Sequence, residues 1–119
     1  MSAANTLLLA MIRECIRTGR YAFTSHALIK HPTSEGFTPR QAIEAINNGD
    51  IIEHYPEQSR CLIAGTASGI VISKEYITTY IHCVCHYDDV NQIVIVTMYR
   101  PRSDTWRNHA SRKAQSGER

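Results

Sequence analysis

One uninterrupted run of strand-forming residues constrains the fold more than any other feature of this chain. The seven residues Ile93–Tyr99 are β-branched, aromatic or otherwise apolar, and Asn91 and Pro101 bracket them with turn-forming chemistry. A strand that is apolar on both faces is typical of the centre of a sheet. Residues Tyr80–Tyr87 form a second candidate strand, and the polar connection 88–91 has hairpin length. We therefore expect a central antiparallel hairpin that the rest of the chain covers or extends.

Three segments ahead of this hairpin have helical signals. Residues 5–18 place apolar side chains at helical spacing, and Arg13, Arg17 and Arg20 follow on one flank, which predicts a solvated basic face. Ser25 is a candidate cap for a short helix that ends before Pro32. The third segment, 38–49, opens with a capping box, Thr-Pro-Arg-Gln, and ends at Asn-Gly.

Short strands are expected between and after these helices. Residues 21–24, 51–55 and 60–64 have strand composition, and the last two are separated by a tight connection. The stretch 65–73 contains glycine and serine and is expected to be irregular, although residues 70–72 could extend a strand. The element order indicates an α+β domain.

Composition and charge place this domain in a broad class. A chain of 119 residues that is 43% hydrophobic suits one domain, expected over residues 1–107. No apolar run reaches membrane-spanning length and no signal peptide stands out, so we expect a cytoplasmic protein without a membrane partner. Residues 100–119 carry six basic and two acidic side chains, so the net charge of +2 leaves −2 for residues 1–99. Residues 108–119 are expected to be a disordered basic tail.

The strand 80–87 separates its side chains into two sets. His82, Val84 and His86 share one face, expected to point to solvent or a groove, and Ile81, Cys83, Cys85 and Tyr87 share the other, expected to be core. The four cysteines, Cys15 and Cys61 included, are interpreted as reduced core thiols. A zinc site is disfavoured because Cys83 and His86 point to opposite faces, and we expect no metal and no cofactor.

The remaining polar inventory suits metal-independent cleavage of RNA. Such cleavage needs a base for the 2′-hydroxyl proton, an acid for the leaving 5′-oxygen and cations for the phosphate. His26, in the first turn of the short helix, and His82 are candidates for the proton transfers. Candidates for holding the phosphate and the bases are Lys30, Arg60, Arg100, His86, Tyr99 and Trp106. The alternative is a non-enzymatic module that binds protein or nucleic acid with the same face or with the basic tail.

An ordered series of motifs resembles a known family. The series consists of Tyr21-Ala-Phe-Thr-Ser-His26-Ala27 with Lys30, residues 36–56, residues 61–65, Ile81-His82-Cys-Val84, and Val96-Thr-Met-Tyr99-Arg-Pro101 with Trp106. Over residues 12–107 it looks like the uncharacterised family of small bacterial domains grouped with the RelE-like and BrnT-like toxins.

This resemblance implies both a fold and an activity. The fold would have two to three N-terminal helices on one face of a small, mostly antiparallel sheet of four to five strands, with the other face open. The activity would be that of a ribonuclease toxin with RNA as substrate and a small antitoxin protein as partner, and the matching catalytic positions are His26, Lys30, His82 and Tyr99. The chain departs from the family in having Lys30 in place of arginine, in Pro32, and in a longer stretch between Gly65 and His82 that could cover the open face.

Overall fold

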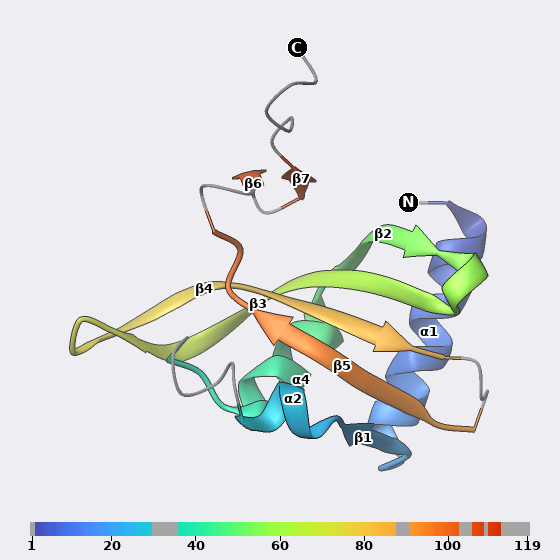
Figure 1. The fold of residues 1–119 in the computed structure, drawn as a ribbon, viewed down its shortest axis with the longest axis horizontal. Helices are drawn as coiled ribbons and strands as arrows, with labels where there is room; N and C mark the ends of the chain where they lie inside the picture. Colours follow the sequence, from blue (N-terminus) through green and yellow to red (C-terminus); the bar gives the residue numbers. More distant parts are fainter. Residues whose placement is uncertain (1, 30–35, 88–90, 103–105, 109, 113–119) are drawn as a thin grey trace.

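The computed structural model describes residues 2–29, 36–87, 91–102, 106–108 and 110–112. The strands are β1 (Tyr21–Phe23), β2 (Asp50–Tyr55), β3 (Arg60–Ile72), β4 (Glu75–His86), β5 (Ile93–Tyr99), β6 (Trp106–Asn108) and β7 (Ser111–Arg112). Helices α1 (Ala3–Arg17), α2 (Ser25–Ile29) and α4 (Pro39–Asn48) all precede β2, and the 3-10 turn η1 (Pro56–Gln58) follows it. Figure 1 shows how they are arranged.

The main sheet has five strands in the order β1-β5-β4-β3-β2. All neighbours are antiparallel except β1 and β5, which are parallel. The expected α+β class, with the helices on a mostly antiparallel sheet, is therefore confirmed. Two details differ from expectation: β4 takes the middle of the sheet, and β5 lies one strand from the edge, beside the short β1. The hairpin pairing of β4 with β5 is as expected, although residues 88–90 of its connection lie outside the described residues.

The helices bury one face of this sheet. The core joins apolar residues of α1, α2 and α4 to one alternating set of strand side chains, which includes Cys61, Ile63, Ile81, Cys83, Cys85 and Ile95. We call the opposite face, where the other alternating set lies, the open face. The expected core set of β4 is thus confirmed, and all four cysteines are free and buried. None of the helices that the structure describes is long and apolar enough to cross a membrane.

Helix α1 is held at both ends and tied to α4. The Ser2 hydroxyl accepts from the Asn5 N–H at the N-terminus, and Gly19 adopts φ +76° just after the C-terminus, where a left-handed residue is needed. Arg13 donates to the carbonyl oxygens of Ile46, at 3.2 Å, and of Gly49. The expectation of a solvated flank is wrong for Arg13, because its guanidinium satisfies the last carbonyls of α4.

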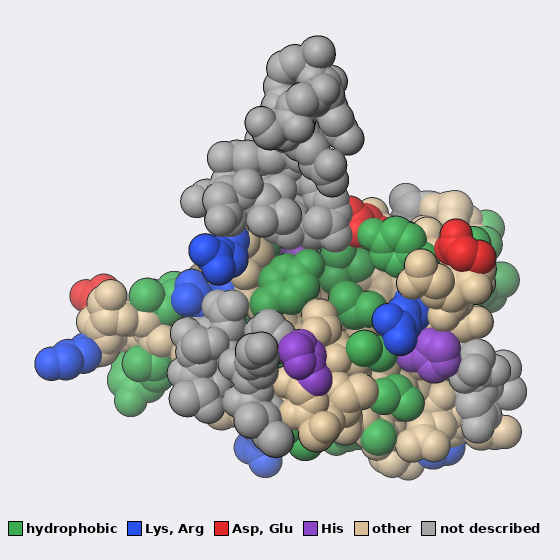
Figure 2. All heavy atoms as spheres, viewed as in Figure 1, with side chains coloured by type: hydrophobic (Ala, Val, Ile, Leu, Met, Phe, Trp, Pro, Cys, Tyr) green, Lys and Arg blue, Asp and Glu red, His purple; other side chains and the backbone are tan. Residues whose placement is uncertain are grey.

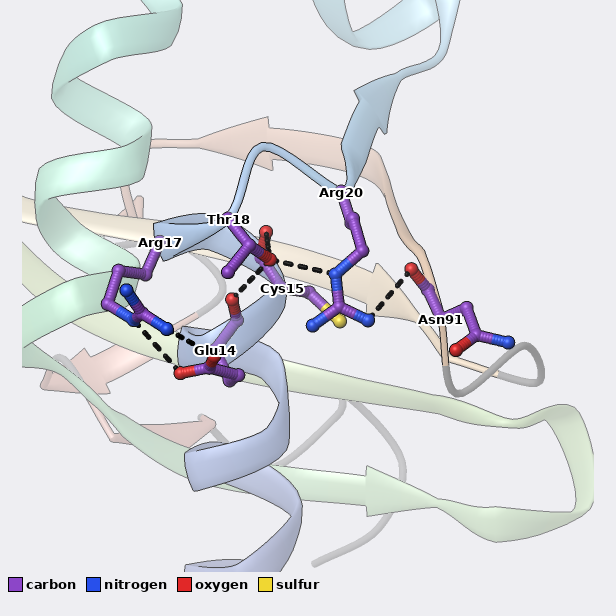
Figure 3. A network of polar contacts seen from close by, with 6 residues as sticks. All are labelled: Glu14, Cys15, Arg17, Thr18, Arg20 and Asn91. Atoms are coloured by element: carbon purple, nitrogen blue, oxygen red, sulfur yellow. Dashed lines mark hydrogen bonds and ion pairs between the residues drawn. The ribbon is translucent and has the colours of Figure 1, made fainter.

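The other two arginines of that flank stay near the surface (Figure 3). Arg17 pairs with Glu14 along the helix, and this hydrogen bond holds the pKa of the Glu14 carboxyl below its ordinary value. Arg20 donates to the Thr18 hydroxyl at 2.8 Å and to the Asn91 carbonyl at 3.4 Å. Arg20 therefore ties the end of α1 to the start of β5.

Helix α4 begins as its sequence predicts and lies very close to β3. The capping box of Thr38 and Gln41 is complete. At its other end, a Cβ on Gly65 would lie 1.8 Å from the Ala45 carbonyl oxygen, so only glycine permits this approach. The Asn48 side chain clips the helix to β3 by accepting from the Thr66 N–H at 2.9 Å and donating to the Thr66 carbonyl at 2.7 Å.

The stretch expected to be irregular is part of a long hairpin. Strand β3 runs through residues 65–72 and pairs with β4 as far as Ile72 and Glu75, with a register shift between Ala67 and Ile70, and Ser73 and Lys74 turn the chain with positive φ. The expected strand extension at residues 70–72 is therefore confirmed, and the expected irregularity is confined to that register shift. Figure 1 shows this hairpin projecting away from the helices. It continues the plane of the sheet, so the expectation that residues 65–82 could fold over the open face is wrong.

The C-terminal segment contains a small second sheet. Strands β6 and β7 pair with each other, through Trp106 with Arg112 and Asn108 with Ser111, apart from the main sheet (Figure 1). Residues 113–119 of the predicted tail lie outside the described residues, as do Lys30 and Pro32.

Candidate functional site

The open face carries the polar side chains of this domain in rows that cross the strands. One row is Tyr55, Arg60, His86 and Val94, the next is Glu53, Leu62, Val84 and Thr97, and the third is Asp50, Ala64, His82 and Tyr99. Cross-strand partners of an antiparallel sheet point to the same face, so each row is a set of neighbours. Figure 2 shows basic and histidine side chains among hydrophobic ones on the side of the molecule turned to the viewer.

The first row brings together two predicted substrate-binding residues. Arg60 and His86 are direct cross-strand partners, and both side chains are half-buried. Tyr55 lies on the other side of Arg60, and its hydroxyl donates to Oε1 of Glu53. A guanidinium, an imidazole, a carboxylate and a phenol therefore occupy neighbouring positions of three strands at one corner of the open face, which we call the Arg60 corner.

His82 and Tyr99 form a second polar pair, in the third row. The imidazole Nδ1 lies 3.4 Å from the Tyr99 hydroxyl, and the two rings contact edge to face with centroids 5.3 Å apart. His82 is on the predicted face of β4, but its side chain is 0% exposed. The expectation that it points to solvent or a groove is therefore wrong, and Tyr99, which is half-buried, is the accessible member of the pair.

A hollow of about 210 Å³ opens beside this third row. It lies where the C-terminus of α4 meets the start of β2, and its lining includes Asn48, Gly49, Asp50, Ala64, Thr66 and Tyr80. Ala64 is the cross-strand partner of both Asp50 and His82, so the hollow and the His82–Tyr99 pair adjoin. We call this feature the Asp50 hollow.

The other predicted site residues lie elsewhere. His26 is exposed in the first turn of α2, and α2 packs on the helix-covered side through the buried Ala27. The structure therefore does not bring His26 and His82 together, because they belong to different layers. Arg100 follows β5 directly and is half-buried. Trp106 is described by its backbone alone, in β6, and Lys30 lies outside the described residues.

The helix-covered side holds groups that burial makes unreactive. Burial raises the pKa of the Cys61 and Cys83 thiols to about 12 each, and it also raises the pKa of the Cys85 thiol well above its ordinary value. His54 lies on this side with its Nε2 at 2.5 Å from the Tyr87 hydroxyl. Among the described residues, no group of three or more His, Cys, Asp or Glu side chains is placed to hold a metal ion.

Sequence reasoning did not find Glu53, Tyr55 or Asp50. Their faces depend on an irregularity in the pairing of β2 with β3, between Ile51 and Glu53, which no local pattern indicates. Simple alternation from Ile51, a core residue, would have placed Glu53 in the core as well. The short polar segment Asn-Gly-Asp after α4 was a signal for Asp50, but it was interpreted only as the end of the helix.

Comparison with known proteins gives a family and no activity. Residues 23–100, which are 78 of the 119, match the family described as "Domain of unknown function (DUF4258)". The match runs from the end of β1 to the residue after β5 and so includes strands β2 to β5 with their open-face residues. Neither a search of curated proteins nor a search of solved structures finds a match.

Proposed function

The chain belongs to the family of domains of unknown function DUF4258, and we propose that it is a metal-independent endoribonuclease that cleaves RNA on the open face of its sheet. The observation that carries this proposal is the Arg60 corner. Arg60 lies on the middle one of three strands, with His86 on one side and Tyr55 and Glu53 on the other. Neighbouring strands are about 4.8 Å apart, so the backbones of His86 and Tyr55 lie about 10 Å apart across Arg60, and Glu53 lies in the next row on the Tyr55 side.

This arrangement supplies the three functions that RNA cleavage requires. Arg60 binds the scissile phosphate and stabilises the charge that develops on its oxygens. Glu53 accepts the proton of the 2′-hydroxyl, and the 2′-oxygen forms a bond to phosphorus. His86, as the imidazolium, donates a proton to the 5′-oxygen as the phosphorus–oxygen bond to it breaks. The products are a 2′,3′-cyclic phosphate and a free 5′-hydroxyl, and no metal takes part.

The His82–Tyr99 pair has a supporting role in this proposal. Tyr99 presents a half-buried ring on which an RNA base can stack, and its hydrogen bond to the buried His82 fixes that ring. Arg100, immediately after Tyr99, is a further contact for the RNA backbone. The proton transfers predicted for His26 and His82 thus pass to Glu53 and His86, which flank the same cation.

The biological setting that we propose is a toxin–antitoxin pair, and the support for it is the sequence resemblance to small toxins. A small antitoxin protein would be the partner. We expect expression of the chain to arrest bacterial growth, and Arg60→Ala or His86→Ala to relieve the arrest. Growth arrest that persists in both variants would show that the toxicity does not depend on the Arg60 corner.

The direct test is cleavage of a mixed structured and single-stranded RNA by purified protein in excess chelator. We expect His86→Ala, Arg60→Ala and Glu53→Gln each to lower the rate by about 10² or more, which is typical for loss of an acid, a base or a charge-stabilising group.

Matched variants make this test specific. Lys74→Ala removes a cation at the tip of the β3–β4 hairpin, outside the Arg60 corner, and should leave the rate unchanged. Far-ultraviolet circular dichroism and melting of each variant check the fold. If the rate falls with His26→Ala or His82→Ala but not with His86→Ala, the proton transfers belong to the residues that the resemblance implied. No cutting by the wild type would refute the proposal for free RNA.

A second candidate is a binding module without catalysis. His82, predicted to transfer a proton, is 0% exposed and cannot reach a substrate, which favours a domain that binds without reacting. This candidate predicts RNA or protein binding that survives His86→Ala and is lost when the basic residues 108–119 are deleted. Fluorescence anisotropy measures the binding affinity of the His86→Ala variant and of the chain that lacks residues 108–119, and these two affinities separate the binding module from the ribonuclease.

A further inference from the structure

We propose that the Asp50 hollow is a binding site for a guanine base. It is distinct from the Arg60 corner, and it rests on the proposed function only in that the base belongs to an RNA strand. The two features lie at opposite ends of the same stretch of sheet. Ala64, in the hollow, and Arg60 are four residues apart on β3, which is about 13 Å in a strand.

The hollow has a preformed shape, because two of its lining residues, Gly49 and Gly65, lie where backbone packs closely on backbone. A Cβ on Gly65 would lie 1.8 Å from the Ala45 carbonyl oxygen, and one on Gly49 would lie 2.3 Å from the Ala64 carbonyl oxygen. Asn48 fixes the helix end against β3 through both of its amide atoms. The volume of about 210 Å³ suits a small planar ring system, since a cavity of about 150 Å³ takes benzene.

The charged group at the hollow is a hydrogen-bond acceptor, the carboxylate of Asp50. The C-terminus of α4 carries a partial negative charge, and Asp50 follows it with an exposed carboxylate. Within the described part of the chain, no hydrogen bond or ion pair engages that carboxylate. Arg13, by contrast, reaches the carbonyl oxygens of Ile46 and Gly49 from the α1 side. The Asp50 hollow therefore repels phosphate and favours a ligand with N–H donors.

Among the RNA bases, guanine fits this chemistry best. Its Watson–Crick edge presents an N1–H and an N2 amino group side by side, which a carboxylate can accept as two parallel hydrogen bonds. Adenine and cytosine each offer one amino group on that edge, so they can form only one of the two bonds. The ring of Tyr80 lines the same hollow and provides an aromatic surface for the base.

The test compares the binding of GMP and AMP to the full chain by NMR titration. The two nucleotides carry the same phosphate, so a difference in affinity reports the base. We expect GMP to bind at least about fivefold more tightly, the factor for a weak bidentate contact. Asp50→Asn should bring the ratio of the GMP affinity to the AMP affinity close to one, because an amide group has one acceptor oxygen where a carboxylate has two. Glu75→Gln removes the same charge on the β3–β4 hairpin and should keep the ratio.

Each outcome decides a separate question. Equal affinity for the two nucleotides, or a ratio that Asp50→Asn leaves unchanged, overturns the guanine site. Nucleotide binding needs no cleavage, so a preference for GMP in a chain that does not cut RNA supports the guanine site and contradicts the ribonuclease. Cleavage with no preference for guanine, together with equal affinity for GMP and AMP, supports the ribonuclease and contradicts the guanine site.

Discussion

Replacing Gly65 with alanine tests the close packing of α4 on β3. The new Cβ would lie 1.8 Å from the carbonyl oxygen of Ala45, 2.6 Å from its carbonyl carbon and 2.9 Å from its Cα. These are backbone atoms, so no side chain can turn aside to relieve the contact. Ordinary contact begins at 3.4 Å, and α4 must therefore retreat by about 1.6 Å, the difference between 3.4 and 1.8 Å.

The expected cost has two parts. Overpacking of a close interface costs about 1–3 kcal/mol. The retreat also stretches the hydrogen bonds of Asn48 to Thr66, now 2.7 and 2.9 Å long, and losing each costs about 1 kcal/mol. We expect Gly65→Ala to lower the free energy of unfolding by about 3 kcal/mol. For a domain of this size the melting temperature would fall by roughly 10–20 °C.

Urea unfolding followed by circular dichroism measures this change, with Gly19→Ala as the matched control. Gly19 has φ +76° and nothing within 4 Å of a built Cβ, so alanine there meets only backbone strain, about 1 kcal/mol. The double variant Gly65→Ala, Ala45→Gly should not recover stability, because the clashing atoms of Ala45 are backbone. A Gly65→Ala variant as stable as Gly19→Ala, or a rescue by Ala45→Gly, would refute the close packing of α4 on β3.

Three further predictions concern stability. Arg13→Ala should cost about 1.5–3 kcal/mol in urea unfolding, because two carbonyls at the end of α4 lose a charged donor, whereas the exposed Arg17→Ala should change little. Thr38→Ala removes half of the capping box and should cost about 1 kcal/mol, and a loss below a few tenths would contradict the cap. Burial raises the pKa of the Cys61 and Cys83 thiols from 9.0 to about 12, so they favour folding fully below pH 9 and lose this contribution as the pH rises from 9 to 12. Urea midpoints should fall across that range, and fall less steeply in the Cys61→Ala, Cys83→Ala double variant.

Local signals predicted the elements of the fold where sequence chemistry and tertiary structure agree. The capping box at Thr38 and the alternation of β4 are set by neighbours in the sequence, so both are read correctly from it. Glycine and serine are weak strand formers and predict irregular structure for residues 65–73, which holds only for the register shift between Ala67 and Ile70. Strand β3 forms there because β4 pairs with it and because α4 can approach only at a glycine, Gly65, and both are tertiary causes.

Burial was the least predictable property of the candidate site. The face of His82 followed from alternation, but its complete burial depends on what surrounds the middle of that face, which the pattern of β4 does not contain. Arg60 and His86 were predicted one by one as substrate contacts, and their pairing required the register of β3 with β4. The face on which a residue lies can thus be predicted from the sequence, whereas its partner on the neighbouring strand cannot.

The irregularity in β2 shows how one extra residue creates the Arg60 corner. Asp50 pairs with Ala64 and Ile51 with Ile63, but Glu53 then pairs with Leu62, so Ile52 is the additional residue. Regular alternation would turn Glu53 and Tyr55 toward the helices and His54 toward the open face. The extra residue reverses all three: His54 meets Tyr87 on the helix-covered side, and the carboxylate and phenol join Arg60 and His86. The base of the proposed reaction, Glu53, is therefore placed by a local break in the strand pairing. Without that break, Ile52 and His54 would lie on the open face in place of Glu53 and Tyr55.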